Sequence, residues 1–435
     1  MIAQFIFLVL LAVGVYFFAK RVKQVSRNIN LGREKVINDR PSDRWKTMAR
    51  VAMGQSKMGS RPVAAFFHFL IYIGFVIINI EVLEIIMDGL FGTHRILSFM
   101  GGFYNFLIGS FEYLALGVLA ACVVFLVRRN VLRLRRFHMA EMTSWPKSDA
   151  NFILIIEILL MTAFLLMNAS DAILQSRGMD HYVVAGAFPV SSWLFSFLDN
   201  YSIESLVMIE RGAWWFHIIG ILAFLNYVPY SKHFHILLAF PNTWYGSLNP
   251  KGQFNNMESV TNEVKLMMDP SAAVPAVDPN AAPQRFGAKD VKDLNWKQLM
   301  DAYACTECGR CTDVCPANIT GKLLSPRKIM MDTRDRLEEV GKNIDAHGSN
   351  YEDGKSLIND YIKEEEIWAC TSCNACVEAC PVLIDPLSII MDLRRFKVME
   401  ESAAPAGLNG MFTKMENNGA PWQFSPADRM NWTEN

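Results

Sequence analysis

The sequence has 435 residues, which is enough for two or three domains. Hydrophobic residues make up 51% of it, charged residues only 20%, and the formal net charge is -1. This balance gives no indication of a nucleic-acid-binding protein. Almost all of the apolar excess lies before residue 232, and the remainder is an ordinary soluble sequence in composition. We therefore expect a membrane part followed by a soluble part.

Five apolar stretches have about the 20 residues that a membrane-crossing helix needs. They lie near 2–19, 63–87, 106–127, 152–174 and 212–231. The first stretch is not typical of a signal peptide, because basic residues follow it rather than precede it and no small-residue cleavage site ends it. We expect it to be a retained span, so that residues 1–231 form a bundle of five transmembrane helices.

The charged residues between the spans predict the orientation. The connection 20–62 contains twelve Lys and Arg against three acidic residues, and 128–151 contains six Lys and Arg. The other two connections, 88–105 and 175–211, contain only Arg95, Arg177 and Arg211. By the positive-inside rule both basic connections are cytoplasmic and the N-terminus is outside. The fifth span then leads the chain into the cytoplasm.

Four histidines in or beside the spans are candidate cofactor ligands: His68, His217, His233 and His235. A buried imidazole in a membrane needs a partner, so each is a functional candidate. His217 and His235 are eighteen residues apart, or five helical turns and about 27 Å, so they share a helix face if the helix continues through Pro229. His233 points to the other side.

His68 and His235 lie at the same depth on two different spans, as the two axial ligands of a b-type haem must. The alternative for each histidine is a structural role, in which its ring forms a hydrogen bond to a neighbouring helix. A second haem at His217 is a further alternative, although the second span has no histidine at that depth. His94 and His181, in the outward connections, are the residues that could reach it.

The spans also contain acidic side chains near their ends. They are Glu81, Glu84, Asp88, Glu112 and Asp171 towards the outer ends and Glu157 near an inner end. We expect most of them to be solvated helix-end charges, with one or two available for proton exchange at a quinone site. Cys122, within the third span, is expected to be a packing residue.

The soluble part is predicted to consist of three segments. Residues 232–288 form a cytoplasmic linker, in which the Pro- and Ala-rich stretch 269–288 is expected to be an extended tether. Residues 289–400 form a small domain that begins with the helical pattern "VKDLNWKQLMDAYAC". Residues 401–435 form a tail that we expect to bind a partner.

Two cysteine cassettes, "CTECGRCTDVCP" and "CTSCNACVEACP", hold eight of the nine cysteines. In each Cys-x2-Cys-x2-Cys-x3-Cys-Pro run, three thiolates surround one 4Fe–4S cluster and the fourth belongs to the other cluster. The first cluster should bind to Cys305, Cys308, Cys311 and Cys380. The second should bind to Cys370, Cys373, Cys376 and Cys315. Helical sequences, "SPRKIMMDTRDRL" and "DPLSIIMDLRR", follow the two cassettes as in a pseudo-repeat.

Disulfides and zinc are the alternatives for these cysteines. The tight spacing would strain a disulfide framework and indicates metal sites in a reducing compartment, in agreement with the predicted cytoplasmic side. Structural zinc sites normally use two separated pairs of ligands rather than a crossed run that ends in proline. Two clusters close together are typical of an electron-transfer chain.

These motifs carry a resemblance to known families. The cassettes resemble the iron–sulfur C-type subunit of heterodisulfide reductases and related respiratory oxidoreductases. The membrane part, with His68, His217 and His235, resembles the haem b subunit family of respiratory nitrate reductase and of heterodisulfide reductase. That type has a second histidine ten residues after the first, where this sequence has Ile78, so the resemblance implies the inner haem. The tail "ENNGAPWQFSPADRMNW" resembles the segment that leads into a cysteine-rich CCG domain in fused relatives, but no CCG motif follows here.

The sequence therefore predicts an all-α protein, in which a transmembrane bundle precedes a small ferredoxin-like domain with two 4Fe–4S clusters. We expect an electron-transfer subunit of a quinone-linked oxidoreductase in a bacterial inner membrane. Since no nucleophile or nucleotide motif occurs, substrate chemistry belongs to a partner. The resemblance implies a separate CCG-domain subunit, an electron-transfer flavoprotein as donor and menaquinone as acceptor. The alternatives are an assembly subunit without haem or quinone and a redox-gated transporter, which the lack of an internal repeat in the spans disfavours.

Overall fold

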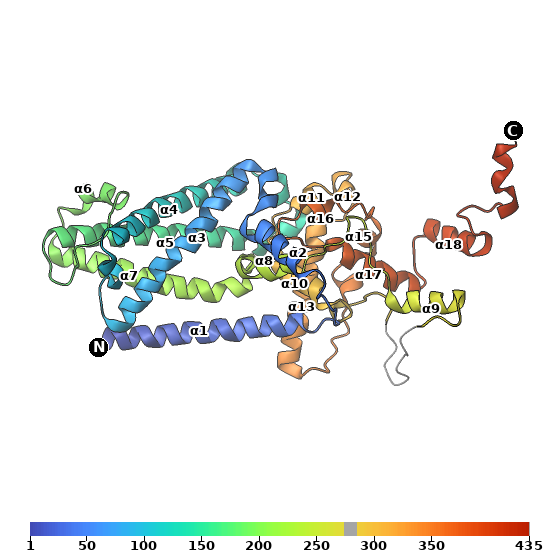
Figure 1. Cartoon of the computed structure of the whole chain (residues 1–435), viewed down its shortest axis with the longest axis horizontal. Helices are drawn as coiled ribbons and strands as arrows, with labels where there is room; N and C mark the ends of the chain where they lie inside the picture. The colour runs from blue at the N-terminus through green and yellow to red at the C-terminus, as the bar shows by residue number, and fades with distance from the viewer. Residues whose placement is uncertain (274–284, 435) are drawn as a thin grey trace. The chain divides into compact units, whose positions relative to one another are not determined.

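The computed structural model describes residues 1–273 and 285–434, and the regular structure of these residues is helical (Figure 1). The chain divides into two compact units. The first unit comprises residues 1–27, 40–245 and 303–309, and the second comprises 28–39, 246–302 and 310–435. Most of the predicted extended tether, residues 274–284, lies outside the described residues.

Five helices of the first unit are long and apolar enough to cross a membrane. They are α1 (Ile2–Ile29), α3 (Pro62–Phe91), α4 (Gly102–Leu126), α5 (Trp145–Ser176) and α7 (Ile203–Tyr227). They coincide with the five predicted stretches. Most extend beyond the apolar residues, because polar residues such as Lys20 to Asn28 continue the same helix.

The ends of these helices follow local sequence rules. Pro62 occupies the first turn of α3, where its missing N–H costs nothing, and Gly92 ends the helix with φ of 72°. Ser202 caps α7 by accepting a hydrogen bond from the Ser205 N–H. The bounds of the spans are therefore set by proline, glycine and serine as well as by hydrophobicity.

Helix α5 lies at the centre of the first unit and packs against α4 and α7, while α4 packs against α3. Large apolar side chains between these helices form the core, including Phe7, Ile78, Phe111, Phe164, Trp214 and Ile218. Many other large apolar side chains are exposed, among them Phe66, Leu83, Phe106 and Phe216. Exposed apolar surface of this extent is expected where a bundle faces lipid.

Shorter helices complete the first unit: α2 (Pro41–Met48), α6 (Phe195–Leu198) and α8 (His235–Trp244). Helix α2 packs against α8. The Arg44 side chain donates a hydrogen bond to the Trp244 carbonyl at 3.1 Å, and the rings of Trp45 and Trp244 meet edge to face. The chain after the last span is thus helical here, where the sequence predicts a linker.

The second unit contains short helices around two longer ones. Its helices are α9 (Glu258–Met268), α10 (Trp296–Ala304, whose last two residues belong to the first unit), α11 (Arg310–Asp313), α12 (Pro316–Ile319), α13 (Pro326–His347), α14 (Leu357–Asp360), α15 (Glu364–Trp368), α16 (Ala375–Ala379), α17 (Pro386–Met399) and α18 (Ala406–Asn418). Helix α11 packs against α16, and α13 packs against α17. These pairs confirm the predicted pseudo-repeat.

The segment 28–39, which follows α1, is part of the second unit. Its backbone pairs with residues 294–296: the Arg33 N–H donates to the Leu294 carbonyl at 2.8 Å, and the Trp296 N–H donates to the Arg33 carbonyl at 3.1 Å. The Trp296 indole N–H also donates to the Lys35 carbonyl at 2.9 Å. The chain between the first two spans therefore folds together with the domain that contains the second cassette.

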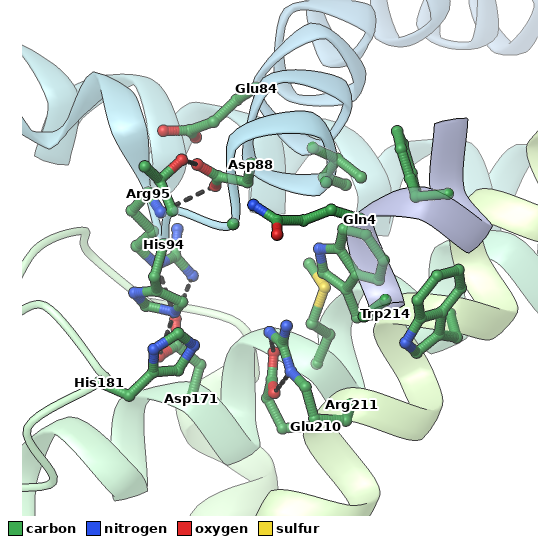
Figure 2. Close-up of a pocket in the computed structure, with 18 of the residues that line it drawn as sticks. Gln4, Glu84, Asp88, His94, Arg95, Asp171, His181, Glu210, Arg211 and Trp214 are labelled. Carbon is green, nitrogen blue, oxygen red and sulfur yellow. Dashed lines mark hydrogen bonds and ion pairs between the residues drawn. The ribbon is translucent and has the colours of Figure 1, made fainter. Parts of the chain in front are cut away.

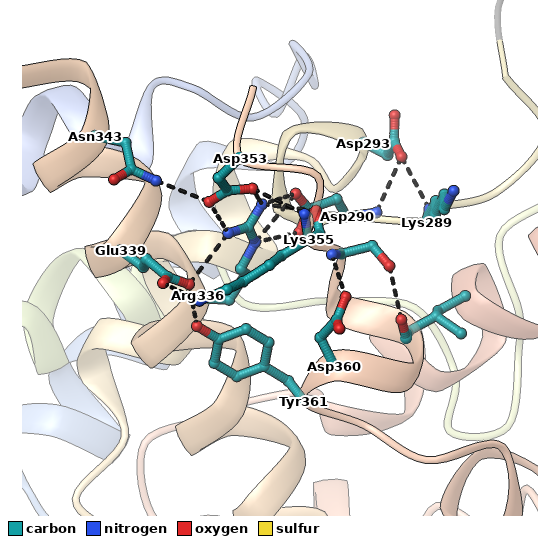
Figure 3. A network of polar contacts seen from close by, with 12 residues as sticks. Lys289, Asp290, Asp293, Arg336, Glu339, Asn343, Asp353, Lys355, Asp360 and Tyr361 are labelled. Atoms are coloured by element: carbon teal, nitrogen blue, oxygen red, sulfur yellow. Dashed lines mark hydrogen bonds and ion pairs between the residues drawn. The ribbon is translucent and has the colours of Figure 1, made fainter. Parts of the chain in front are cut away.

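Arg336 of α13 holds together three segments of the second unit (Figure 3). Its guanidinium contacts Asp290 at 2.7 Å and Asp353 at 2.6 Å, and it also donates to the Lys355 carbonyl at 2.9 Å. The Arg336 side chain is only 4% exposed. Two carboxylates on one buried guanidinium make a strong, directional junction.

Candidate cofactor sites

The first site is a histidine pair in the first unit. His68 lies in the second turn of α3 and His235 begins α8, and their ring centroids are 6.4 Å apart. Two imidazoles on opposite sides of one metal, at about 2 Å per metal–nitrogen bond, have centroids about 6 Å apart. The observed separation fits a single iron between the two rings.

Contacts of the Nδ1 atoms hold both imidazole rings in place. His68 Nδ1 is 3.0 Å from Gln55 Oε1, and His235 Nδ1 is 2.9 Å from the Lys232 carbonyl. Since both acceptors are oxygens, Nδ1 is the protonated nitrogen and Nε2 carries the lone pair of a neutral ring. Orientation of a ligand ring by a hydrogen bond of its other nitrogen is typical of metal-binding histidine.

The route by which His235 reaches this position differs from the prediction. Helix α7 ends at Tyr227, a 3₁₀ turn covers Val228–Tyr230, and Ser231 is extended with φ of -109° and ψ of 157°. Pro229 and the Ser231 cap on His233 N–H break the helix before α8 begins at His235. The premise that His217 and His235 share one continuous helix face is therefore wrong.

His233 and His217 take other positions. The His233 ring packs between Phe224 and His235, at centroid distances of 5.4 Å and 5.6 Å. The His217 ring is 1% exposed, and its Nδ1 is 2.9 Å from the Leu160 carbonyl. Phe164 packs against it at 6.0 Å.

The second site is a small cavity of the second unit. It is lined by Cys315 of the first cassette together with Cys370, Cys373 and Cys376 of the second. This is the crossed set of ligands that the spacing predicts. Apolar residues, including Leu324, Leu387 and Ile390, form the rest of the wall.

The chemistry of this donor set fits an iron–sulfur cluster. Burial raises the pKa of the Cys370 and Cys376 thiols, so these side chains need a bound cation to stay ionised. Four soft sulfur ligands around one apolar cavity are suited to iron–sulfur clusters rather than to hard cations. In the part of the chain that the structure describes, no group of three or more His, Cys, Asp or Glu side chains is arranged to hold a single metal ion.

The backbone of the two cassettes shows the same conformations at equivalent positions. Glu307 and Gly309 have positive φ of 52° and 72°, and Ser372 and Asn374, 65 residues later, have 58° and 60°. Left-handed residues between right-handed ones turn successive N–H groups towards one concave side, as in anion and cluster sites. The Ser372 N–H lies 3.4 Å from Cys370 Sγ.

The assignment of the other four cysteines to one cluster stays a prediction from their spacing. Cys305 and Cys380 are buried, and Cys308 and Cys311 are partly exposed. The Ile384 N–H donates to Cys380 Sγ at 3.3 Å. Cys122 is fully buried among apolar residues of the first unit, as expected of a packing residue.

The acidic side chains near the outer span ends contradict the prediction that most are solvated. Glu81, Glu84, Glu112 and Asp171 are all at most 3% exposed. Arg95, which the sequence places in a connection, turns inward and donates to Asp171 Oδ2 at 2.6 Å. Charge pairing across the bundle makes burial of carboxyl groups tolerable.

Hydrogen bonds extend this network. Arg95 donates to the Tyr104 hydroxyl at 3.1 Å, and Tyr104 donates to Glu84 at 2.8 Å. Asn168 accepts from Arg95 at 3.0 Å and donates to Glu112 at 3.1 Å. Part of this network borders a cavity of about 210 Å³, shown in Figure 2, together with His94 and His181.

His94 and His181, which the sequence offers as possible ligands of a second haem, contact each other and the acidic network instead. Their rings contact each other at 5.5 Å, and His94 Nε2 is 3.3 Å from Asp171 Oδ1. The Val183 N–H donates to His94 Nδ1 at 3.3 Å, so both nitrogens of His94 are engaged. His94 is therefore part of the acidic network, through its contact with Asp171.

Comparison with known proteins defines the class. Residues 297–381 match the family model described as a 4Fe-4S dicluster domain. This match includes both cassettes in full and supports two iron–sulfur clusters. The chain is therefore an iron–sulfur protein that also has five helices long and apolar enough to cross a membrane.

The relatives make the relationship more specific. The chain is 29% identical to the probable iron-sulfur-binding oxidoreductase FadF of Bacillus subtilis, over 99% of this chain and 60% of FadF. It is 28% identical to the EtfAB:quinone oxidoreductase of Syntrophomonas wolfei, over 91% of this chain and 55% of that protein. It is 26% identical to one component of the dihydromethanophenazine:CoB--CoM heterodisulfide reductase of Methanosarcina acetivorans, over 33% of this chain and 35% of that protein.

These matches confirm the predicted relationship to the iron–sulfur oxidoreductases related to heterodisulfide reductase. The chain spans less than two thirds of the length of FadF and of the EtfAB:quinone oxidoreductase. No solved structure gives a significant match.

Proposed function

We propose that this protein relays electrons between a cytoplasmic redox partner and the quinone pool, through two 4Fe–4S clusters and a b-type haem. The observation that carries the proposal is the crossed cysteine cavity, in which Cys315 joins the triad of the other cassette. Crossed ligation keeps two clusters close together, as an electron-transfer chain requires. A structural role would need only one metal site.

The histidine pair supports the haem. His68 and His235 come from two elements, meet at 6.4 Å and are both oriented through Nδ1. A bound haem would supply one-electron transfer within the bundle. Beside it, the His233 ring packs between the rings of Phe224 and His235. His217 is the remaining candidate, for a second haem.

The orientation is part of the proposal. Residues 28–39, between the first two spans, fold into the same unit as the second cassette. A connection between spans and a domain that folds with it must lie on the same side of the membrane. Together with the basic charge of 20–62, this supports cytoplasmic clusters, an outward N-terminus and a bacterial inner membrane.

The partners are proposed from the relatives and from the tail. The name of the Syntrophomonas protein joins an electron-transfer flavoprotein with quinone, which supports a flavoprotein donor and a quinone acceptor for this chain as well. Residues 401–435 expose Trp422, Phe424, Met430 and Trp432, with between 46% and 75% of each side chain accessible. Such aromatic exposure is typical of an interaction surface, and we assign it to a CCG-domain subunit.

The test is the cofactor content of the whole chain purified without oxygen. We expect about eight irons per chain in two cubane clusters and a reduced-minus-oxidised spectrum with a b-type α band. His68→Ala and His235→Ala should lose that band and retain the clusters, whereas His347→Ala, in the second unit, should keep both. Clusters without any haem band in the wild type would favour an assembly subunit instead.

A further inference from the structure

The cavity of about 210 Å³, shown in Figure 2, lies at the C-terminal end of α3, whereas His68 lies in the second turn of that helix. Four spans contribute to its wall: Gln4 of α1, Glu84 of α3, Asp171 of α5 and Trp214 of α7. Binding sites for drug-sized molecules measure about 300–1,000 Å³. This cavity therefore suits a smaller organic group, and it is much larger than a metal ion needs.

Glu81 is the residue that most needs an explanation. Its side chain lines the cavity and is 3% exposed, and its Oε2 has no hydrogen-bond partner among the described residues. An unsatisfied buried carboxyl oxygen costs about 1–3 kcal/mol or more. A ligand that exchanges a hydrogen bond or a proton with Glu81 would remove this cost.

The histidines connect the cavity wall with its surroundings. His181 is exposed, its ring contacts His94, and His94 lies against Asp171, which is 1% exposed. These three side chains form a continuous series of proton-binding groups from the exposed surface to the buried wall.

The opposite wall is aromatic. Phe7 packs against Trp214 at a centroid distance of 5.6 Å, and Trp214 contacts Trp215 at 5.0 Å. Flat indole and phenyl faces provide a surface on which a planar ring can stack. His217 follows Trp214 by about one helical turn on α7, so the candidate second haem position adjoins this wall.

We propose that this cavity binds the headgroup of the quinone and that Glu81 and the His94–Asp171 pair supply its two protons. The inference rests on the proposed function. A quinone accepts two electrons from the reduced clusters of this chain, which the flavoprotein donor reduces, and its two carbonyl oxygens each gain a proton. Glu81 provides one proton, His94 provides the other, and both groups are reprotonated from solvent through His181.

The location can be tested on the unmodified protein. A menaquinone analogue with an azide on its ring is added to the whole chain in lipid nanodiscs, activated with light, and the labelled peptides are identified by mass spectrometry. We expect label in residues 1–11, 81–95 and 207–215, and its loss when excess menaquinone is present. Displaceable label near His68 and His235 instead would overturn the assignment, as would label that menaquinone does not displace.

The roles can be tested with Glu81→Gln and a matched control, Glu157→Gln, which changes a membrane glutamate outside the cavity. Glu81→Gln should slow the oxidation of reduced clusters by menaquinone about 100-fold, as loss of a general acid does. It should still bind the photoreactive analogue, and Glu157→Gln should oxidise at the wild-type rate. Equal rates in wild type and Glu81→Gln would contradict the proton role. A wild type whose clusters no quinone oxidises would refute the proposed function itself.

Discussion

Arg394 of α17 directs its guanidinium at the backbone of the second cassette. It donates to the carbonyls of Ile367 at 2.8 Å and Cys370 at 2.5 Å, and it lies over the Trp368 ring at 5.3 Å. A fixed positive charge beside a cluster favours the reduced state, which carries one more negative charge. We therefore expect Arg394 to position the second cassette and to raise the reduction potential of a cluster bound there.

Arg394→Gln should lower the potential of one cluster by about 50 mV, since 59 mV corresponds to a tenfold change for a one-electron couple. Arg394→Lys should restore part of the potential because it keeps the charge. A redox titration followed by electron paramagnetic resonance measures both. Arg395→Gln, which removes the neighbouring pair with Asp392, is the control, and an equal shift in that variant would argue against a specific effect.

Arg336 makes a prediction about stability. Arg336→Met should lower the free energy of unfolding of the second unit by about 2–3 kcal/mol, because Asp290 and Asp353 lose their shared partner. Hydrogen bonds from Arg336 hold the pKa of Asp353 at about 2. Because this pKa lies below the unfolded value of about 3.9, the wild type gains stability above that pH and loses it as pH falls towards 2.

The effect of Arg336→Met on stability is measured as the shift of the denaturant midpoint, followed by cluster absorbance. Arg334→Met is the control, because it removes a charge that pairs with the neighbouring residue Asp335. Equal shifts of the midpoint in Arg334→Met and Arg336→Met would contradict a specific stabilising effect of the Arg336 contacts with Asp290 and Asp353.

Individual residues differed in how well the sequence predicted them. The cysteines and His68 could be proposed as ligands from the sequence because their chemistry depends on residue type and spacing. Gln55, Arg95 and Arg394 could not be predicted, because each acts through a residue distant in the sequence. Gln55 contacts His68, 13 residues away, Arg95 contacts Asp171, 76 residues away, and Arg394 contacts Cys370, 24 residues away.

At the scale of elements, we expect the two cassettes to bind their clusters as a crossed pair. Cys315 immediately precedes α12 and lines the cavity together with Cys370, Cys373 and Cys376. Cys315→Ser should therefore reduce the iron content from about eight to about four per chain and remove the signal of the second cluster. Iron and sulfide analysis with electron paramagnetic resonance checks this, and Cys122→Ala is the matched control. Loss of the first cluster instead would mean that the ligation is not crossed.

Helix ends were harder to predict than helix positions. The hydrophobic stretches located all five spans, but the helix of α7 stops at Tyr227 because Pro229 lacks an N–H and Ser231 caps a new turn. The burial of Glu84 and Asp171 was also unpredictable, since charge at a helix end is solvated unless a side chain such as Arg95 folds back onto it.

At the scale of the whole molecule, the topology can be tested with reporters. Fusions after Arg136 and after Gln175 should report opposite sides of the membrane, with the Arg136 fusion on the side of the clusters. The reason is the charge difference between 128–151 and 175–211. A fusion in 28–39 should share the side of the clusters, because that segment folds into the second unit. If the first two fusions reported the same side of the membrane, the count of five spans would be wrong.

The relay as a whole is tested most directly by mixing the reduced protein with quinone in a stopped-flow spectrometer without oxygen. Cluster absorbance and the haem α band are followed together in wild type, His68→Ala and His235→Ala. We predict that both chromophores of the wild type are oxidised with formation of quinol, and that clusters of the two variants stay reduced or oxidise at least about 100-fold more slowly. Cluster oxidation at the wild-type rate in both variants would contradict a path through the His68–His235 pair.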